Sequence, residues 1–350
     1  MSSKLFTSVP AIAGTLFCFL LLTAGCKKSG TDTKQDIVFT VPANFPPPHY
    51  NFSNNPVTTA GFELGRKLFY DPRLSRDNTV SCGSCHQQFA SFVHAGHIVS
   101  HGIENRLGKR NSPPVVNMAW SIDFFWDGGV HDLDLVPPNP IKNPVEMDEQ
   151  FANVLEKLRN DDKYPSMFKA AFGTDEINTT RFLHAMSQFM NMLVTANSRY
   201  DKYVRNEGVT LTGEELAGKT LFEQKCATCH ATDLFTDHGF HNNGIQSFIR
   251  DSGRYAITLA PEDIGRFKTP TLRNIEKTAP YMHTGGFATL QSVLDFYSEG
   301  MHVTPTLDTL LTRNGTTGIP LTATEKTQLI AFLKTLTDEE FIRDSRFAEQ

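Results

Sequence analysis

Two short stretches carry residues that could do chemistry: CGSCH at 82–86 and CATCH at 226–230. In each, two cysteines stand two residues apart and a histidine follows at once. This pattern suits a redox dithiol, half of a zinc site, or haem attached through two thioethers with the histidine on the iron. A dithiol does not need the histidine, and zinc would leave both histidines unexplained. The spacing therefore favours two c-type haems, held by Cys82, Cys85, Cys226 and Cys229, with His86 and His230 as axial ligands.

The N-terminus indicates export. Lys4 precedes an apolar run from Val9 to Leu22, which is short for a membrane span and typical of a secretory signal peptide. The run ends in LLTAGC, which resembles the lipobox of bacterial lipoproteins, so Cys26 is expected to carry lipid. A plain signal peptide is the alternative. We expect a signal peptide at 1–25 and a periplasmic protein whose only contact with the membrane is this lipid.

Composition narrows the function further. The chain has 350 residues, a net charge of -5 and a pI near 6.2, so it carries no basic footprint for nucleic acid. Of the six cysteines, Cys18 would leave with the signal peptide and Cys26 would take lipid. The other four would pair as free thiols in an oxidising compartment, whereas thioether bonds to haem would use them all.

Helical patterns dominate the rest of the chain. Residues 26–58 are polar and proline-rich, which is typical of a tether. Capping boxes at Thr212 to Glu215 and at Thr322 to Glu325 predict helix starts. Few runs alternate between apolar and polar residues, so we predict a mainly α fold.

An internal repeat divides this helical region. GRKLF at 65–69 precedes the first haem motif, and GKTLF at 218–222 precedes the second. Further on, SPPVVN at 112–117 matches TPTLRN at 269–274, and a Gly pair follows each at the same distance, in WDGG and HTGG. We therefore expect two related, cytochrome c-like haem domains, at 59–205 and 206–350.

Longer motifs resemble a known family. With both haem motifs, RNSPPVVN, FFWDGG, NPVEM, GRFKTPTLRN and APYMHTGGF occur in the order seen in the bacterial di-haem cytochrome c peroxidases and their MauG-type relatives of methylamine utilisation. The resemblance runs from about Gly61 to Leu336. It implies an N-terminal haem that meets hydrogen peroxide and a C-terminal haem that receives electrons.

The resemblance also implies a distal ligand for the first haem. His94, His97 and His101 all lie just downstream of the first motif. The SHG context of His101 matches the family's distal histidine, which must leave the iron before peroxide binds. For His94 and His97 we expect packing in a loop or at the surface.

Two further roles come with the resemblance. Glu146 matches the catalytic glutamate, which would carry a proton between the peroxide oxygens. The family often pairs it with a glutamine, but Val136 stands at that position, so a second distal hydrogen-bonding group is missing. Trp126 matches a tryptophan between the haems and would relay electrons; packing in the core is the alternative.

The sixth ligand of the second iron distinguishes the branches of the family. Tyr297 stands where MauG-type proteins carry tyrosine, whereas the peroxidases proper use methionine. Met301, expected one helical turn on, is the alternative ligand, and a second iron without a close ligand is another. The resemblance also implies Ca²⁺ between the domains, bound by the Asn111 side chain and the carbonyls of Thr278 and Pro280.

These residues predict an enzyme that reduces hydrogen peroxide to water with electrons from a small periplasmic donor similar to cytochrome c. One alternative is a MauG-like oxidase of side chains in a partner protein, which Tyr297 and Val136 favour. A di-haem electron carrier without catalysis is the other. The resemblance also suggests a homodimer.

Overall fold

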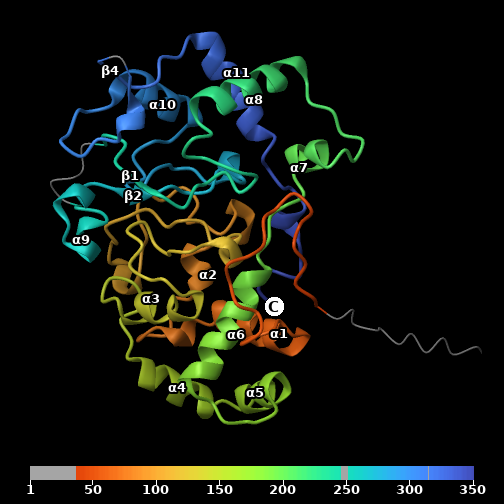
Figure 1. The fold of residues 1–350 in the computed structure, drawn as a ribbon. Helices are drawn as coiled ribbons and strands as arrows, with labels where there is room; N and C mark the ends of the chain where they lie inside the picture. The colour runs from red at the N-terminus through yellow and green to blue at the C-terminus, as the bar shows by residue number, and fades with distance from the viewer. Residues whose placement is uncertain (1–36, 246–250, 314) are drawn as a thin grey trace, which may run out of the picture. The chain divides into compact units, whose positions relative to one another are not determined.

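The chain folds into a body built mainly of helices (Figure 1). The computed structural model describes residues 37–245, 251–313 and 315–350, so the predicted signal peptide and Cys26 lie outside the described residues. Within these ranges, no helix is both long and apolar enough to cross a membrane. The helices are α1 (Thr59–Phe69), α2 (Cys82–Cys85), α3 (Pro138–Lys142), α4 (Phe151–Arg159), α5 (Tyr164–Phe172), α6 (Thr179–Met192), α7 (Arg199–Val204), α8 (Gly213–Lys225), α9 (Tyr255–Thr258), α10 (Leu290–Asp295) and α11 (Ala323–Lys334).

The strands are short. β1 (Phe240–His241) pairs antiparallel with β2 (Phe267–Lys268), and β3 (Thr312–Arg313) pairs antiparallel with β4 (Thr316–Thr317). Each strand has two residues, so the strands join loops rather than form a core sheet. The prediction of a mainly α fold is confirmed.

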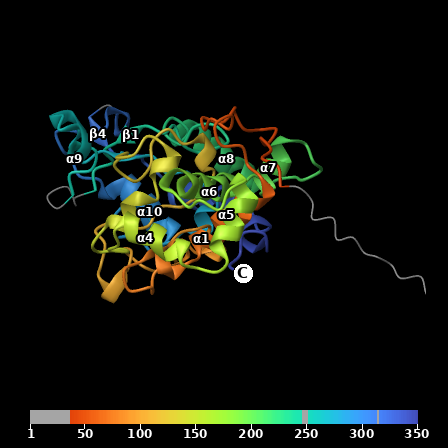
Figure 2. The ribbon, with the colours of Figure 1, turned by 90° about the horizontal axis from the view of Figure 1, so that it is seen from below.

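Helix α1 packs along α6, and a glycine allows the close approach (Figure 2). A Cβ on Gly65 would lie 2.0 Å from the carbonyl oxygen of Ala185, so a larger residue would force the helices apart. The ring of Phe69 on α1 packs against Phe189 on α6 at 5.1 Å between centroids. Phe69 also approaches the His86 imidazole, at 6.5 Å between centroids, so this helix pair supports the first haem motif.

Helices α8 and α11 pack against each other in the same way (Figure 1), and the second motif begins directly after α8. A Cβ on Gly218 would lie 1.9 Å from the carbonyl oxygen of Gln328. Phe222 and Phe332 bring their ring centroids to 5.2 Å in the apolar layer between the two helices. Gly65 in GRKLF and Gly218 in GKTLF thus each allow two helices to approach closely.

Both capping boxes predicted from the sequence are present. The Thr212 hydroxyl accepts from the Glu215 N–H and the Thr322 hydroxyl from the Glu325 N–H, each at 3.2 Å. The two carboxylates accept in turn from the N–H groups of these threonines, at 2.8 and 2.7 Å. These bonds satisfy free N–H groups at the starts of α8 and α11.

Residues 37–58, which the sequence assigned to a tether, pack against the body. The Trp120 indole donates to the carbonyl oxygen of Pro46 at 2.7 Å, and its ring contacts Phe45 edge-on at 5.1 Å. The Asn44 amide donates to Asp201 and Asp233 at 3.0 and 2.9 Å. Aromatic residues within the proline-rich stretch explain this packing, because they bury apolar area that a free linker would expose.

A fully buried ion pair stabilises the second half of the chain. The Arg273 guanidinium donates to both carboxylate oxygens of Asp201 at 2.8 Å, and neither side chain is exposed. Arg273→Met would leave the Asp201 carboxylate buried without its partner. We therefore expect the free energy of unfolding, measured with urea on the haem-loaded protein, to fall by about 3–5 kcal/mol.

The control for this prediction is Arg199→Met. Arg199 pairs with Glu215 at 2.6 Å, but its side chain is 51% exposed, so the expected loss is at most about 1 kcal/mol. Equal losses in the two variants would contradict the assignment of the buried pair.

Candidate functional site

The first haem motif lies on a short helix. Helix α2 begins at Cys82 and ends at Cys85, and His86 is its C-cap residue. Burial raises the pKa of the Cys82 thiol to about 12 and that of Cys85 to about 11, so both stay protonated at neutral pH. The His86 Nδ1–H donates to the carbonyl oxygen of Phe92 at 2.8 Å. This bond fixes the tautomer and leaves Nε2 as a ligand for iron.

The second motif has the same local chemistry. Burial raises the pKa of Cys226 to about 12 and that of Cys229 to about 11. The His230 Nδ1–H donates to the carbonyl oxygen of Phe235 at 3.1 Å, which again leaves Nε2 free to bind a metal. Burial lowers the pKa of His230, so the imidazole is neutral, as a ligand must be.

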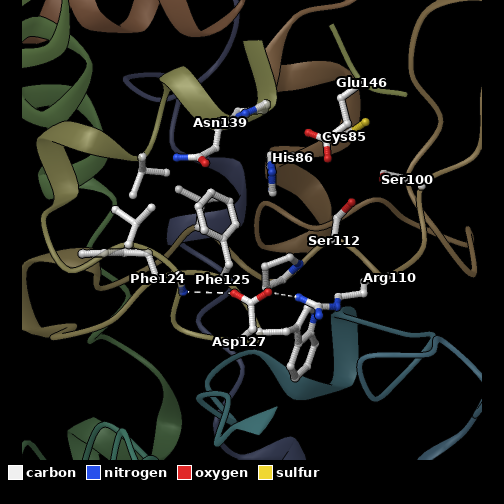
Figure 3. A pocket seen from close by; sticks show the side chains of 18 of the residues that line it. Cys85, His86, Ser100, Arg110, Ser112, Phe124, Phe125, Asp127, Asn139 and Glu146 are labelled. Carbon is white, nitrogen blue, oxygen red and sulfur yellow. Dashed lines mark hydrogen bonds and ion pairs between the residues drawn. The ribbon is translucent and has the colours of Figure 1, made fainter. Parts of the chain in front are cut away.

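A cavity of about 1090 Å³ lies beside the first motif. Cys82, Cys85 and His86 line it, so two thiols and an imidazole nitrogen that can bind iron share one cavity. Figure 3 shows Cys85 and His86 in its wall. Lys268 of β2 also lines it and donates to the carbonyl oxygen of Asp123 at 2.8 Å; burial lowers its pKa to about 8. A buried ammonium suits a ligand that carries carboxylates, as haem does. The residues present therefore fit a covalently bound haem.

Glu146 lies in the wall of this cavity (Figure 3). The Asn143 amide donates to its carboxylate at 2.8 Å, which fixes the orientation of the carboxylate. Burial raises the pKa of Glu146, and the bond from Asn143 lowers it in part. Glu146 therefore lines the same cavity as His86.

His101 lies elsewhere. Within the described part of the chain, it is not among the residues that line the cavity. Its imidazole packs edge-on against His97, at 4.7 Å between centroids, and His97 stacks on His94 at 3.9 Å. The backbone of His101 still lies close, because its carbonyl oxygen is 3.5 Å from the Cys85 sulfur. The structure therefore gathers the three histidines, next to Ser100 and Gly102, which do line the cavity.

Trp126 connects the cavity with the second half of the chain. It lines the cavity, and its indole N–H donates to the carbonyl oxygen of Asn111 at 2.8 Å. Its ring lies 6.2 Å from the His283 imidazole, which stacks on Phe267 at 3.5 Å. The carbonyl oxygen of Trp126 accepts from the Lys268 N–H at 2.8 Å. These contacts hold the indole rigidly between residues of the two predicted domains.

The predicted calcium ligands come from two segments that are joined by backbone hydrogen bonds, one around residues 96–111 and one around residues 278–283. The Asn111 N–H donates to the carbonyl oxygen of His283 at 2.8 Å, and its side-chain amide donates to the carbonyls of His97 and Ile98 at 3.1 and 3.2 Å. Thr278 is buried, and Pro280 follows through a cis peptide bond. These contacts orient the Asn111 amide, and calcium binding there remains a prediction.

Tyr297 approaches the second motif. Burial raises the pKa of its phenol to about 12, and the thiols of Cys226 and Cys229 lie near enough to contribute to this increase. The Asn243 amide lies 3.3 Å from the Tyr297 hydroxyl and 3.6 Å from the sulfur of Met282. Asn243 and Met282 are therefore additional neighbours of the predicted ligand, which the sequence did not reveal.

Met301 does not continue the helix of Tyr297. Helix α10 ends at Asp295, and residues Phe296–Gly300 form a wider π-helical turn, after which Met301 has extended backbone. The expectation that Met301 lies one α-helical turn after Tyr297 is therefore wrong. The cause is the π-turn, whose i to i+5 bonds rotate the following residue away from the α-helical face.

Other functional residues were also missed from the sequence. Asn143 orients Glu146 and Lys268 places a charge in the cavity, yet neither belongs to a pattern with a known chemical meaning. The signal for Asn143 is its position three residues before Glu146, in a turn where the Glu146 N–H donates to the Asn143 carbonyl oxygen at 3.0 Å.

Comparisons with known proteins agree with these sites. A family model described as di-haem cytochrome c peroxidase matches residues 59–208. The methylamine utilization protein MauG of Methylorubrum extorquens is 34% identical over 298 residues, which cover 81% of this chain and 80% of that protein. Cytochrome c551 peroxidase of Nitrosomonas europaea is 34% identical over 284 residues, covering 79% and 80%. The chain belongs to the di-haem cytochrome c peroxidase family.

The predicted resemblance is thus confirmed, and with it a peroxidase-type oxidoreductase whose family implies two haem c groups. A solved MauG-like protein associated with microbial copper homeostasis is 35% identical, with a TM-score of 0.80, over 89% of this chain and 98% of that one. The diheme peroxidase BthA from Burkholderia thailandensis, 23% identical over 83% of this chain and 90% of its own, has a TM-score of 0.71 and shares the fold.

Proposed function

We propose that this chain reduces hydrogen peroxide to water at a haem held by Cys82, Cys85 and His86. The electrons would come from a small donor protein similar to cytochrome c. The observation that carries the proposal is the position of Glu146, whose side chain lines the same cavity as both thiols and the imidazole. The bound haem would supply the redox chemistry, and the chain would supply the proton transfer.

The reaction balances with one proton carrier at the cavity. One peroxide takes two electrons and two protons and gives two waters. Cleavage of the O–O bond is easiest when a proton moves from one oxygen to the other, which then leaves as water. Glu146 has a raised pKa, so it accepts this proton more readily than an ordinary glutamate and returns it to the departing oxygen. Asn143 keeps the carboxylate in one orientation.

The pKa of Glu146 sets the acid limit of the reaction. Glu146 must be ionised to accept a proton, so kcat/KM falls as pH drops through its pKa, which lies above the ordinary value of about 4.3. The bond from Asn143 lowers this pKa, so Asn143→Leu should move the acid limb of the kcat/KM profile to higher pH. An acid limb that stays or moves to lower pH would contradict this role.

Asn153→Leu is the matched control for the pH profile. The Asn153 amide also donates to a buried glutamate, Glu149, at 3.0 Å, but neither residue lines the cavity among those described. The acid limb of this variant is expected to match that of the wild type.

We further propose that the second haem, held by Cys226, Cys229 and His230, takes the electrons from the donor. Trp126 would relay them to the first haem, and its rigid position in the cavity wall supports this role. Tyr297 is the proposed sixth ligand of the second iron, supported by its closeness to both thiols. His101 would bind the first iron in a resting form and leave before peroxide binds.

Oxidation of side chains in a partner protein is the second candidate function. Tyr297 favours it, since a phenolate stabilises iron in its higher oxidation states. Val136, which offers only hydrocarbon to the cavity, favours it too. The third candidate is electron transfer without catalysis. Steady-state peroxide consumption with reduced cytochrome c tests the first candidate. Soret and EPR spectra of the reduced protein without an accessible high-spin haem would exclude both enzymatic functions.

We also propose the cellular location, the domain organisation and the assembly of the protein. Residues 1–25 would direct export to the periplasm, and Cys26 would carry the lipid that anchors the chain. The two haem domains would comprise 59–205 and 206–350, related by the repeat in which Gly65 and Gly218 act alike. Calcium at Asn111, Thr278 and Pro280 would join these domains, and the protein would act as a homodimer.

A further inference from the structure

We propose that the amide of Asn139 is the second distal hydrogen-bonding group of the first haem site and binds peroxide beside Glu146. This inference rests on the proposed function and adds a residue to its substrate site. The family often carries a glutamine at the position that Val136 occupies in this chain. Val136 lines the cavity with a hydrocarbon side chain, so its side chain neither donates nor accepts a hydrogen bond.

Asn139 follows Val136 by one turn of chain. The Asn139 N–H donates to the carbonyl oxygen of Val136 at 3.2 Å, and both side chains line the cavity. Pro137, Pro138 and Pro140 surround Asn139 and restrict the backbone angles of this turn. The amide absent at Val136 therefore returns three residues later, on a rigid segment.

Part of the Asn139 amide remains free to bind a ligand. Its nitrogen donates to the carbonyl oxygen of Leu135 at 3.2 Å, which leaves one N–H and the amide oxygen. The side chain is exposed. Figure 3 shows it among the side chains that line the cavity, with His86 drawn between it and Glu146. Asn143 differs, because its amide already donates to the Glu146 carboxylate.

The chemistry of peroxide suits these two groups. Each oxygen of hydrogen peroxide can donate one hydrogen bond and accept others, so it complements an amide that offers both an N–H and a C=O. Glu146 would carry the proton, while Asn139 would hold the oxygen that leaves. If the Asn139 amide served only to bond the Leu135 carbonyl oxygen, its removal would lower the stability of the protein. The affinity of the site for small ligands would then stay unchanged.

The test compares three variants of the haem-loaded protein. Asn139→Leu removes the amide at similar volume, Val136→Gln combined with Asn139→Leu restores an amide one turn earlier, and Asn54→Leu alters an exposed asparagine that does not line the cavity. One readout is the Kd of fluoride, an anion that accepts hydrogen bonds, from optical titration of the half-reduced protein, in which the second haem is reduced and the first, still ferric, has lost its His101 ligand. The other is kcat/KM for hydrogen peroxide.

Loss of one hydrogen bond predicts that both fluoride affinity and kcat/KM fall about tenfold in Asn139→Leu. The double variant should recover at least half of this loss, and Asn54→Leu should match the wild type. Unchanged fluoride affinity in Asn139→Leu would overturn the inference, and so would a wild type that binds no fluoride. If the wild type binds fluoride but consumes no peroxide, the proposed function fails, while a tenfold weaker Kd in Asn139→Leu still supports the ligand-binding role.

Discussion

Glu146→Gln is expected to lower kcat/KM for hydrogen peroxide by about 10³-fold, within the range that general acid–base catalysis contributes. Glutamine keeps the shape of the side chain and a hydrogen bond with Asn143, but it cannot accept a proton from peroxide and return it. The cavity and both thiols stay unchanged, so the haem content should equal that of the wild type. Stopped-flow consumption of peroxide by the reduced protein measures the effect directly.

Asp148→Asn provides the control on the same segment. Asp148 bonds Arg106 at 3.2 Å and Arg76 at 3.3 Å, and it is not among the described residues that line the cavity. Its removal should change kcat/KM less than twofold. Rapid peroxide consumption by Glu146→Gln, or an equal loss in Asp148→Asn, would remove Glu146 from the reaction.

Tyr297→Met is expected to raise the reduction potential of the second haem by on the order of 0.2 V, a part of the roughly 0.8 V that axial ligands span. A phenolate stabilises ferric iron, whereas a thioether favours the ferrous state. The variant should therefore accept electrons from a donor more readily and lose the ability to hold a strongly oxidised second haem. Potentiometric titration followed optically gives the value.

Met301→Leu tests the competing ligand. If Tyr297 binds the iron, this variant keeps the wild-type potential and spectrum, because leucine changes only the extended segment after the π-turn. A large shift of the reduction potential in Met301→Leu, with little shift in Tyr297→Met, would identify Met301 rather than Tyr297 as the ligand.

Local chemistry explains what could be predicted from the sequence. The roles of His86 and His230 follow from their position directly after a Cys-x-x-Cys pair, and nearby carbonyls fix both rings. The helix starts at Thr212 and Thr322 also depend on groups within three residues. These features need no knowledge of the rest of the chain.

A local irregularity in one helix and contacts between distant segments explain what could not be predicted. Met301 failed as the neighbour of Tyr297 because a π-turn, which has no clear sequence signal, interrupts the helix. His101 meets His94 and His97 through a loop whose path depends on tertiary packing. Residues 37–58 looked like a linker because proline and polar residues hid the aromatic side chains that pack on Trp120.

The central claim is tested most directly by an anaerobic titration of the purified chain, first with reductant and then with peroxide, followed by optical and EPR spectra. We predict two covalent haems per chain that reduce at separate potentials. The reduced protein should then have one accessible high-spin haem and be reoxidised with two electrons per peroxide. Two haems that stay low-spin throughout, with no reoxidation by peroxide, would contradict a peroxidase and leave an electron carrier.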